Sequence, residues 1–173
     1  MDLREHIRAV PDFPIPGILF RDITPLLLDG DAFRNACEVM TAPWRESGID
    51  LVASIESRGF IFGAVVAQNL NAGFIPVRKT GKLPWRTRSV QYELEYRADT
   101  LYMHEDAVKA GQRVLVVDDL IATGGTAKAV VELVEGLGGV VAGVGFLIEL
   151  VDLKGRDLLA GYDVRSEITF EGG

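Results

Sequence analysis

The residues best suited to chemistry lie in one thirteen-residue string, Val114–Thr126. The string begins as an apolar, β-branched run, which is typical of a buried strand, and then presents two adjacent carboxylates, Asp118 and Asp119. Glycines let a backbone approach a ligand closely, and the free N–H groups of a helix N-terminus attract anions. The loop that follows is therefore predicted to bind a phosphate group. Its members are Ala122, Thr123, Gly124, Gly125 and Thr126.

The two carboxylates narrow the choice of phosphate ligand. Asp118 and Asp119 would repel a bare phosphate, whereas they suit sugar hydroxyls or a metal ion, so a ligand with both a phosphate and a ribose satisfies the whole string. Two other nucleotide motifs fail. Gly81-Lys82 lacks the first glycine and the hydroxyl residue of a Walker A loop, and a G-x-G-x-x-G pattern would need glycine in place of Ile148. For the two acids alone, an exposed strand end before a glycine turn is an equally good interpretation.

A second candidate for anion binding is the concentration of positive charge in Arg78–Arg88. This segment holds five of the chain's 18 Lys and Arg residues, namely Arg78, Lys79, Lys82, Arg86 and Arg88. Taken alone, such a cluster is more often a solvated basic loop, but beside a phosphate loop it indicates an anionic ligand. The polar stretch from Arg78 to Met103 is much longer than the median connection of about 4–6 residues and favours a lid or binding loop. Within it, Gln91–Tyr96 alternates in the manner of a hairpin arm.

Alternating strand and helix patterns position these residues. Apolar runs predict strands at Leu51–Ile55, Phe74–Val77, Val114–Val117 and Val140–Leu150, and helical patterns predict helices at Phe60–Leu70 and Thr126–Leu137. Near-continuous apolar strands separated by helices indicate an α/β fold with a parallel sheet covered by helices on both faces. Ligands of such sheets bind beyond the carboxyl ends of the strands. The functional residues are therefore expected just after Ile55, Val77, Val117 and Ile148.

The N-terminal part follows a different pattern. We expect a short helix over Arg4–Val10 and irregular chain over Pro11–Gly17, which contains three prolines in seven residues. A longer helix is predicted over Asp31–Ser47, with Asp31 as its N-cap.

Composition excludes several classes of function. The 173 residues suit a single domain, 1–173, and the net charge of −7 argues against a nucleic-acid partner. Cys37 is the only cysteine, and with only His6 and His104 beside it in the sequence a His/Cys zinc site is excluded. No apolar leader and no run of about 20 apolar residues is found, so we expect a soluble, cytoplasmic protein with no membrane partner.

The Val114–Thr126 string resembles the phosphoribosyl pyrophosphate (PRPP) signature of the type I phosphoribosyltransferases, and the whole chain is similar to the adenine branch of that family. The supporting segments are Pro14–Gly17, Phe20–Pro25, Glu56–Phe60, Arg78–Pro84, Tyr92–Tyr96 and Glu149–Arg156. The resemblance implies the type I phosphoribosyltransferase fold, with an N-terminal hood at about residues 1–30 and a flexible lid at about residues 79–104. It also implies a homodimer, which the mean hydropathy of +0.19 fits.

The implied reaction is that of a pentosyltransferase in purine salvage, in which adenine displaces pyrophosphate from PRPP to give AMP. By resemblance, Asp118 and Asp119 hold the ribose hydroxyls, directly or through Mg²⁺ bound with PRPP, and residues 122–126 bind the 5′-phosphate. The departing pyrophosphate needs cations around it. Because they lie in the basic segment beside the predicted phosphate loop, Lys79 and Lys82 are assigned to this group, and the resemblance implies the same role for Arg58. Arg78, Arg86 and Arg88 stay unassigned.

The resemblance also implies which residues handle the purine. Glu95 matches the family's lid glutamate, proposed to donate a proton near N7, and this role requires burial that raises its pKa. Tyr96 is expected to pack beside it, although Arg97 stands where the family usually has glycine. The adenine-binding residues are predicted to be Leu19, Phe20, Arg21 and Leu150, with stacking by Phe20 and Leu150, a carbonyl acceptor at Leu19 and a donor at Arg21.

Two alternatives remain open from the sequence. The first is a phosphoribosyltransferase for another purine such as xanthine, against which the Phe20-Arg21 and Glu95 contexts argue. The second is a non-catalytic, PRPP-sensing regulator that binds DNA, against which the acidic composition and the lack of room for a DNA-binding module argue.

Overall fold

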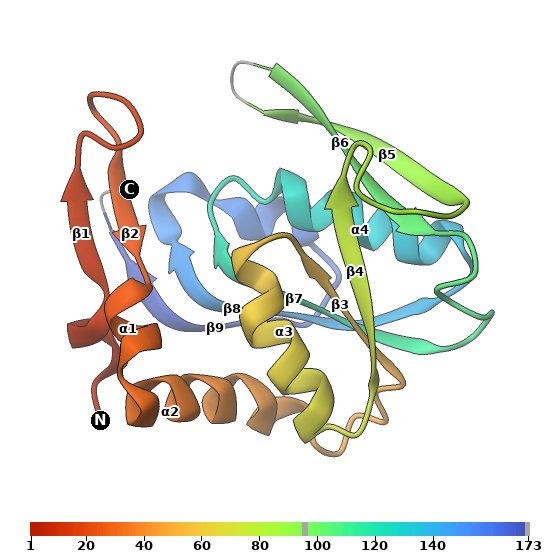
Figure 1. The fold of residues 1–173 in the computed structure, drawn as a ribbon, viewed down its shortest axis with the longest axis horizontal. Coiled ribbons are helices and arrows are strands. Elements are labelled where there is room, and N and C mark those ends of the chain that lie inside the picture. The colour runs from red at the N-terminus through yellow and green to blue at the C-terminus, as the bar shows by residue number, and fades with distance from the viewer. Residues whose placement is uncertain (95–96, 172–173) are drawn as a thin grey trace.

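The computed structural model describes residues 1–94 and 97–171, and within them a seven-stranded sheet lies between helices, beside a two-stranded ribbon (Figure 1). The sheet has the order β5-β6-β4-β3-β7-β8-β9. Its strands are β3 (Leu51–Ile55), β4 (Gly73–Lys79), β5 (Thr87–Leu94), β6 (Arg97–His104), β7 (Arg113–Ile121), β8 (Val140–Leu150) and β9 (Val164–Phe170). The ribbon is formed by β1 (Arg8–Pro11) and β2 (Leu19–Asp22).

The helices connect and cover these strands. The α-helices are α1 (Thr24–Leu28), α2 (Gly30–Thr41), α3 (Arg58–Asn69) and α4 (Gly125–Gly136). Short 3₁₀ helices are η1 (Leu3–His6), η2 (Ala42–Trp44), η3 (Val151–Leu153) and η4 (Gly155–Leu159). In the part of the chain that is described, no helix is long and apolar enough to cross a bilayer.

The predicted parallel sheet is confirmed for five adjacent strands, which pair in parallel in the order β4, β3, β7, β8 and β9. Alternate residues of a strand point to opposite faces. On β7, Leu115 and Val117 pack with α2 and α3, whereas Val114 and Val116 pack with α4. The sheet is thus buried on both faces, which explains why its strands read as continuous apolar runs.

The predicted strands at residues 51–55 and 140–150 have the observed bounds. The strand predicted to end at Val117 instead continues to Ile121, because β7 keeps pairing with β8 as far as Ile121 and Glu149. The two carboxylates therefore lie within the end of β7 rather than beyond it.

Two N-terminal predictions were wrong. Arg4–Val10 is not one helix: η1 ends at His6 and Arg8 begins β1, because residues 8–11 pair antiparallel with residues 19–22. The N-cap of α2 is Asp29, not Asp31, since the Asp29 carboxylate accepts hydrogen bonds from the N–H groups of Asp31 and Ala32. The helix also ends at Thr41, short of Ser47, and passes into a 3₁₀ turn that contains a proline.

The segment predicted to be a lid or binding loop is mostly regular structure. β5 and β6 form an antiparallel hairpin, and β6 joins β4 through the pairs Arg78 with Tyr102 and Lys79 with Leu101. Leu101 and Met103 are fully buried at its base. The hairpin therefore extends the sheet and projects past its edge toward the carboxyl ends of the parallel strands (Figure 1).

Candidate functional site

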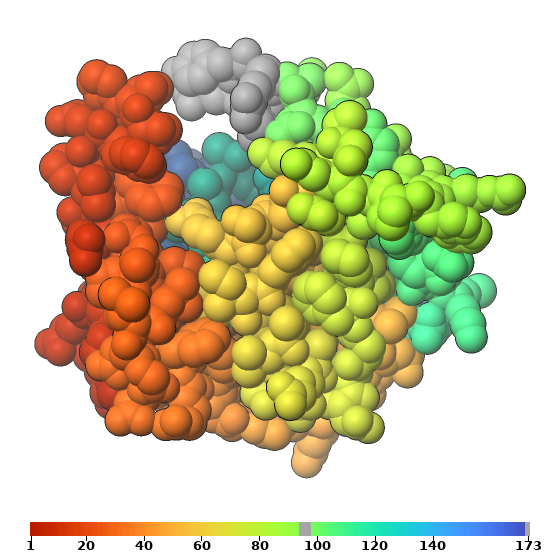
Figure 2. All heavy atoms as spheres, viewed as in Figure 1, coloured from red at the N-terminus to blue at the C-terminus, as the bar shows by residue number. Residues whose placement is uncertain are grey.

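A cavity of about 450 Å³ lies at the carboxyl ends of β3 and β7, at the first turns of α3 and α4. Figure 2 shows the surface hollowed between the N-terminal segment (red) and the hairpin (green), with atoms of later parts of the chain at the floor. Predicted site residues that line the cavity are Arg58, Lys79, Asp118, Asp119, Ala122, Thr123, Gly124 and Thr126. The expectation that functional residues follow the parallel strands is thus met for these positions.

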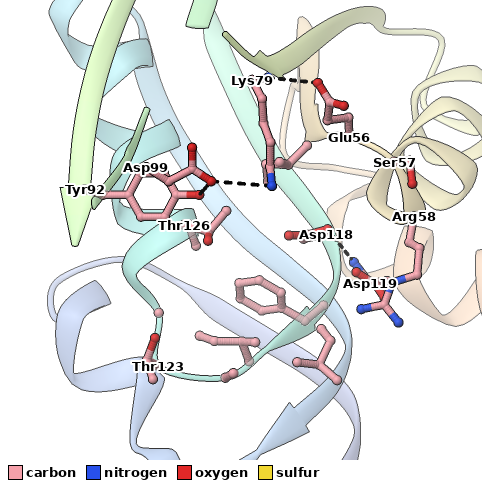
Figure 3. Close-up of a pocket in the computed structure, with 17 residues that line it drawn as sticks. Glu56, Ser57, Arg58, Lys79, Tyr92, Asp99, Asp118, Asp119, Thr123 and Thr126 are labelled. Carbon is pink, nitrogen blue, oxygen red and sulfur yellow. Dashed lines mark hydrogen bonds and ion pairs between the residues drawn. The ribbon is translucent and has the colours of Figure 1, made fainter. Parts of the chain in front are cut away.

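The paired carboxylates lie at the centre of the cavity (Figure 3). Asp119 is only 5% exposed, and the Asp118 carboxylate accepts a hydrogen bond from the Asp119 N–H at 2.9 Å. Burial, and next the negative charge of Asp119, raise the pKa of Asp118 well above its ordinary value. On α3, Gly59 packs against this group so closely that a Cβ there would lie 2.5 Å from Asp118 Oδ1. A glycine in the first turn of α3 is therefore what makes room for Asp118.

The phosphate loop, residues 122–126, leads directly into α4. Gly124 has φ +86°, a conformation that favours glycine, and a Cβ there would lie 2.3 Å from the carbonyl oxygen of Gly155. Gly125 begins α4 and is the one member of the loop that does not line the cavity among the described residues. The first N–H groups of a helix have no partner within the helix, so they face the cavity as anion donors.

Arg58 joins three segments that lie far apart in the sequence. Its Nε lies 3.0 Å from Asp119 Oδ2, and its Cζ lies 5.0 Å from the ring centroid of Phe20 on β2. Within the described residues, Arg58 Nη1 and Asp119 Oδ2 are buried and have no hydrogen-bond partner. Because buried polar groups are normally paired, these two atoms are suited to hydrogen-bond a ligand that enters the cavity.

Lys79 enters the cavity from the end of β4, where two acids that the sequence reasoning missed hold it. Its Nζ lies 3.4 Å from Asp99 Oδ2 on β6, and its backbone N–H donates to Glu56 Oε1 at 2.8 Å. Glu56 also pairs with Arg78 at 3.3 Å, which gives a partner to one of the unassigned arginines. Tyr92 lies across the hairpin from Asp99 and also lines the cavity. Glu56 could have been predicted as a site residue from the sequence, because it directly follows the buried strand β3.

Three residues predicted to act from the lid, Lys82, Glu95 and Tyr96, are not placed in the cavity. Lys82 lies exposed in the turn after β4, where its N–H donates to the Lys79 carbonyl at 3.4 Å, and it does not line the cavity. Glu95 and Tyr96 lie outside the described residues. Their assigned roles therefore stay predictions.

The four predicted adenine-binding residues lie beside the cavity rather than in its lining. Arg58 connects Phe20 with the carboxylates, as described above. The Arg21 guanidinium lies over the ring of Phe170, 4.0 Å from its centroid, and Phe170 on β9 pairs with Leu150 at the end of β8. The hood strand β2, which also carries Leu19, is thus brought to the same edge as Leu150.

The donor set fits a magnesium ion that is shared with a ligand. No group of three or more His, Cys, Asp and Glu side chains in the described ranges is arranged to hold a metal by itself. The carboxylates of Asp118 and Asp119 are hard oxygen donors, and Mg²⁺ is commonly bound by one or two carboxylates together with substrate phosphates.

This fold, with two carboxylates ahead of a phosphate loop, defines the phosphoribosyltransferase class, and residues 27–166 match the family model "Phosphoribosyl transferase domain". A relative from Symbiobacterium thermophilum, named adenine phosphoribosyltransferase, is 56% identical over 98% of this chain and 100% of its own length. The chain belongs to the adenine phosphoribosyltransferases.

Solved structures agree with this assignment. The adenine phosphoribosyltransferase of Thermoanaerobacter pseudethanolicus superimposes with a TM-score of 0.95 at 52% identity, covering 98% of each chain. The enzyme from Saccharomyces cerevisiae, solved with an imino-altritol bisphosphate and adenine, gives a TM-score of 0.89 at 39% identity over 96% of each chain.

Proposed function

We propose that this chain transfers the phosphoribosyl group of PRPP to adenine, forming AMP and pyrophosphate in purine salvage. The observation that carries the proposal is the cavity in which Asp118 and Asp119 meet the phosphate loop at the start of α4. One such site accommodates a ribose and its 5′-phosphate together. The adenine bound in the yeast relative supports the choice of base.

PRPP binds, in this proposal, with its 5′-phosphate on the loop and its ribose hydroxyls at the two carboxylates. The backbone N–H groups of residues 122–126 and the hydroxyls of Thr123 and Thr126 receive the phosphate. Asp119 accepts from a ribose hydroxyl at Oδ2, which within the described residues makes the ion pair with Arg58 but no hydrogen bond. Mg²⁺ bound with PRPP would be held near Asp118 and Asp119, where it neutralises charge on the pyrophosphate.

The leaving pyrophosphate is stabilised by cations that line the cavity. Arg58 has a free, buried Nη1 within the described part of the chain, and Lys79 reaches the cavity from β4. Lys82 is assigned to the same group from its place in the basic segment of residues 78–88. Preorganised positive charge where negative charge develops is a large term in such reactions.

The purine is held between the hood and the end of β8. Phe20 and Leu150 supply apolar faces, and the Leu19 carbonyl accepts from the exocyclic amine. Arg21 donates to a ring nitrogen through its backbone or through its side chain, whose Nε is buried and has no hydrogen-bond partner within the described residues. Glu95 is proposed to exchange a proton with the purine when the hairpin covers the site and excludes water. The proposal includes a cytoplasmic homodimer.

A panel of bases tests the reaction. The chain is incubated with PRPP, Mg²⁺ and each of adenine, hypoxanthine, guanine and xanthine, and nucleotides are separated by chromatography. AMP from adenine alone is the expected result, because an amine acceptor and a ring-nitrogen donor disfavour 6-oxopurines. Product from another base would overturn the roles of Phe20 and Arg21. Binding of PRPP without any product would support a regulator instead.

A further inference from the structure

Arg156, on η4, is the centre of a closed polar network behind the cavity. Its Nε donates to Glu149 Oε1 at 2.7 Å, its Nη1 to the carbonyl of Val164 at 2.8 Å, and its Nη2 to Ser166 Oγ at 2.8 Å. Ser166 Oγ in turn donates to the second oxygen of Glu149. One guanidinium therefore ties η4 to both β8 and β9, and none of its nitrogens is left without an acceptor.

The network contains the buried carboxylate of Glu149, whose negative charge is paired with Arg156. Glu149 is only 7% exposed. Burial alone would raise the pKa of Glu149, but hydrogen bonds from Arg156 and Ser166, with the charge of Arg156, outweigh that effect and lower it. The carboxylate is thus ionised at neutral pH and holds Arg156 firmly, since an unpaired buried charge is strongly unfavourable.

The residue before Arg156 touches the phosphate loop. A Cβ on Gly155 would lie 2.4 Å from the carbonyl oxygen of Ala122 and 3.0 Å from the N atom of Gly124. A Cβ on Gly124 would in turn meet the carbonyl oxygen of Gly155 at 2.3 Å. Two backbones are therefore in direct contact at two glycines, and the position of η4 sets the position of the loop.

The polar network and the phosphate loop are also linked through the pairing of β7 with β8. Ile121, the last residue of β7, is paired with Glu149 of β8, so the network begins one residue before the phosphate loop. A movement of η4 would therefore reach the loop by two routes, through the pairing of Glu149 with Ile121 and through the contact of Gly155 with Ala122 and Gly124.

We propose that Arg156 is a positioning residue for the phosphate loop: by fixing η4 to β8 and β9, it keeps Gly155 against Ala122 and Gly124 and so preserves the loop shape that receives the 5′-phosphate of PRPP. This inference rests on the proposed function, because it takes the loop as the phosphate site. A rigid supporting residue of this kind acts on ligand affinity without touching the ligand.

The test compares Arg156→Met, which removes all the donors at similar length, with Arg165→Met. Arg165 lies on β9 with its guanidinium at the surface, 2.7 Å from Asp163, and is a matched control.

Dissociation constants for ribose 5-phosphate and for adenine are measured by calorimetry, with KM for PRPP, at a temperature where circular dichroism shows each variant folded. Arg156→Met should weaken ribose 5-phosphate binding and raise KM for PRPP by about tenfold, with adenine affinity within about twofold. Arg156→Lys should recover part of the loss, and Arg165→Met should match the unsubstituted chain.

Three outcomes contradict the inference. Unchanged affinity for ribose 5-phosphate in folded Arg156→Met overturns it, and so does an equal loss for adenine and ribose 5-phosphate, which would indicate general loosening. If Arg156→Met does not fold, Ser166→Ala removes the bridging hydroxyl and leaves both charges; a smaller loss in the same direction supports the inference, and no loss overturns it. Failure of the unsubstituted chain to bind ribose 5-phosphate would instead remove the proposed function itself.

Discussion

The carboxyl of Asp118 lies at the end of a buried strand, with Asp119 next to it in sequence and Gly59 packed against it. Burial and the neighbouring charge raise its pKa, so the ionised form is costly in the folded chain without ligand. A group whose folded pKa exceeds its unfolded value binds more protons in the folded state. Folding stability then falls as pH rises from about the ordinary value, 3.8, through the folded pKa.

Asp118→Asn is therefore expected to stabilise the chain and to weaken PRPP binding. The amide keeps an oxygen to accept from the Asp119 N–H but has no charge to bury. The gain in unfolding free energy should grow with pH across that window and be largest above it, because only the carboxylate has a charge to bury. Urea denaturation over a pH series measures it. Asp31→Asn, at an exposed carboxylate 2.7 Å from Arg34, is the control and should change stability by less than about 0.5 kcal/mol. A destabilised Asp118→Asn at neutral pH would contradict this account.

At the residue scale, the sequence predicted the groups that are close together along the chain. Asp118, Asp119 and the phosphate loop occupy one continuous string, so their proximity follows from local order. Asp99 was missed because its approach to Lys79 depends on the register of β6 against β4, which no local pattern contains. Arg58 was found through its place after a strand, but its contact with Phe20 depends on how the hood packs.

At the scale of elements, hydrophobic runs predicted the buried strands well, because strands covered on both faces need apolar residues throughout. The β1–β2 ribbon was not predicted, since each of its short strands gains its hydrogen bonds only from the other. Of the hairpin, the sequence predicted only one arm, from the alternation of residues 91–96, because the other exposed polar residues hide a ladder that runs from Thr87 with His104 onward.

The first turn of α3 gives a sharp test at this scale, through Gly59→Ala. The added Cβ would lie 2.5 Å from Asp118 Oδ1, so the carboxylate must turn away and PRPP affinity should fall by about tenfold or more. Gly30→Ala is the matched control, because Gly30 lies in the first turn of α2, where no atom of residues 1–94 and 97–171 lies within 4 Å of a new Cβ. That variant should keep PRPP affinity and gain up to about 1 kcal/mol of stability. Equal PRPP affinity in both variants would show that Asp118 adapts without cost.

At the scale of the whole molecule, the two ends of the chain meet beside β2, which carries three of the residues proposed to bind adenine. The C-terminal end of the described chain lies beside β2 (Figure 1), and the ring of Phe170 has the guanidinium of Arg21 4.0 Å and that of Arg4 5.2 Å from its centroid. Sequence order gave no signal for this contact, because it joins residues from opposite termini. The resemblance to known enzymes predicted a hood but not what anchors it.

Phe170→Ala should therefore act on adenine and not on PRPP. Losing the ring removes two cation–π contacts, each about 0.5–1 kcal/mol at an exposed site, and frees the Arg21 side chain and with it β2. We expect KM for adenine to rise by about threefold to tenfold, with KM for PRPP nearly unchanged, because the phosphate loop lies on other elements. Phe74→Ala is the control, since Phe74 is also a half-exposed aromatic, packed on Phe60 at 5.7 Å and far along the chain from the hood. It should lower stability without moving KM for adenine. Equal increases in KM for both substrates in Phe170→Ala would mean that the C-terminal strand supports the molecule generally and does not position the hood.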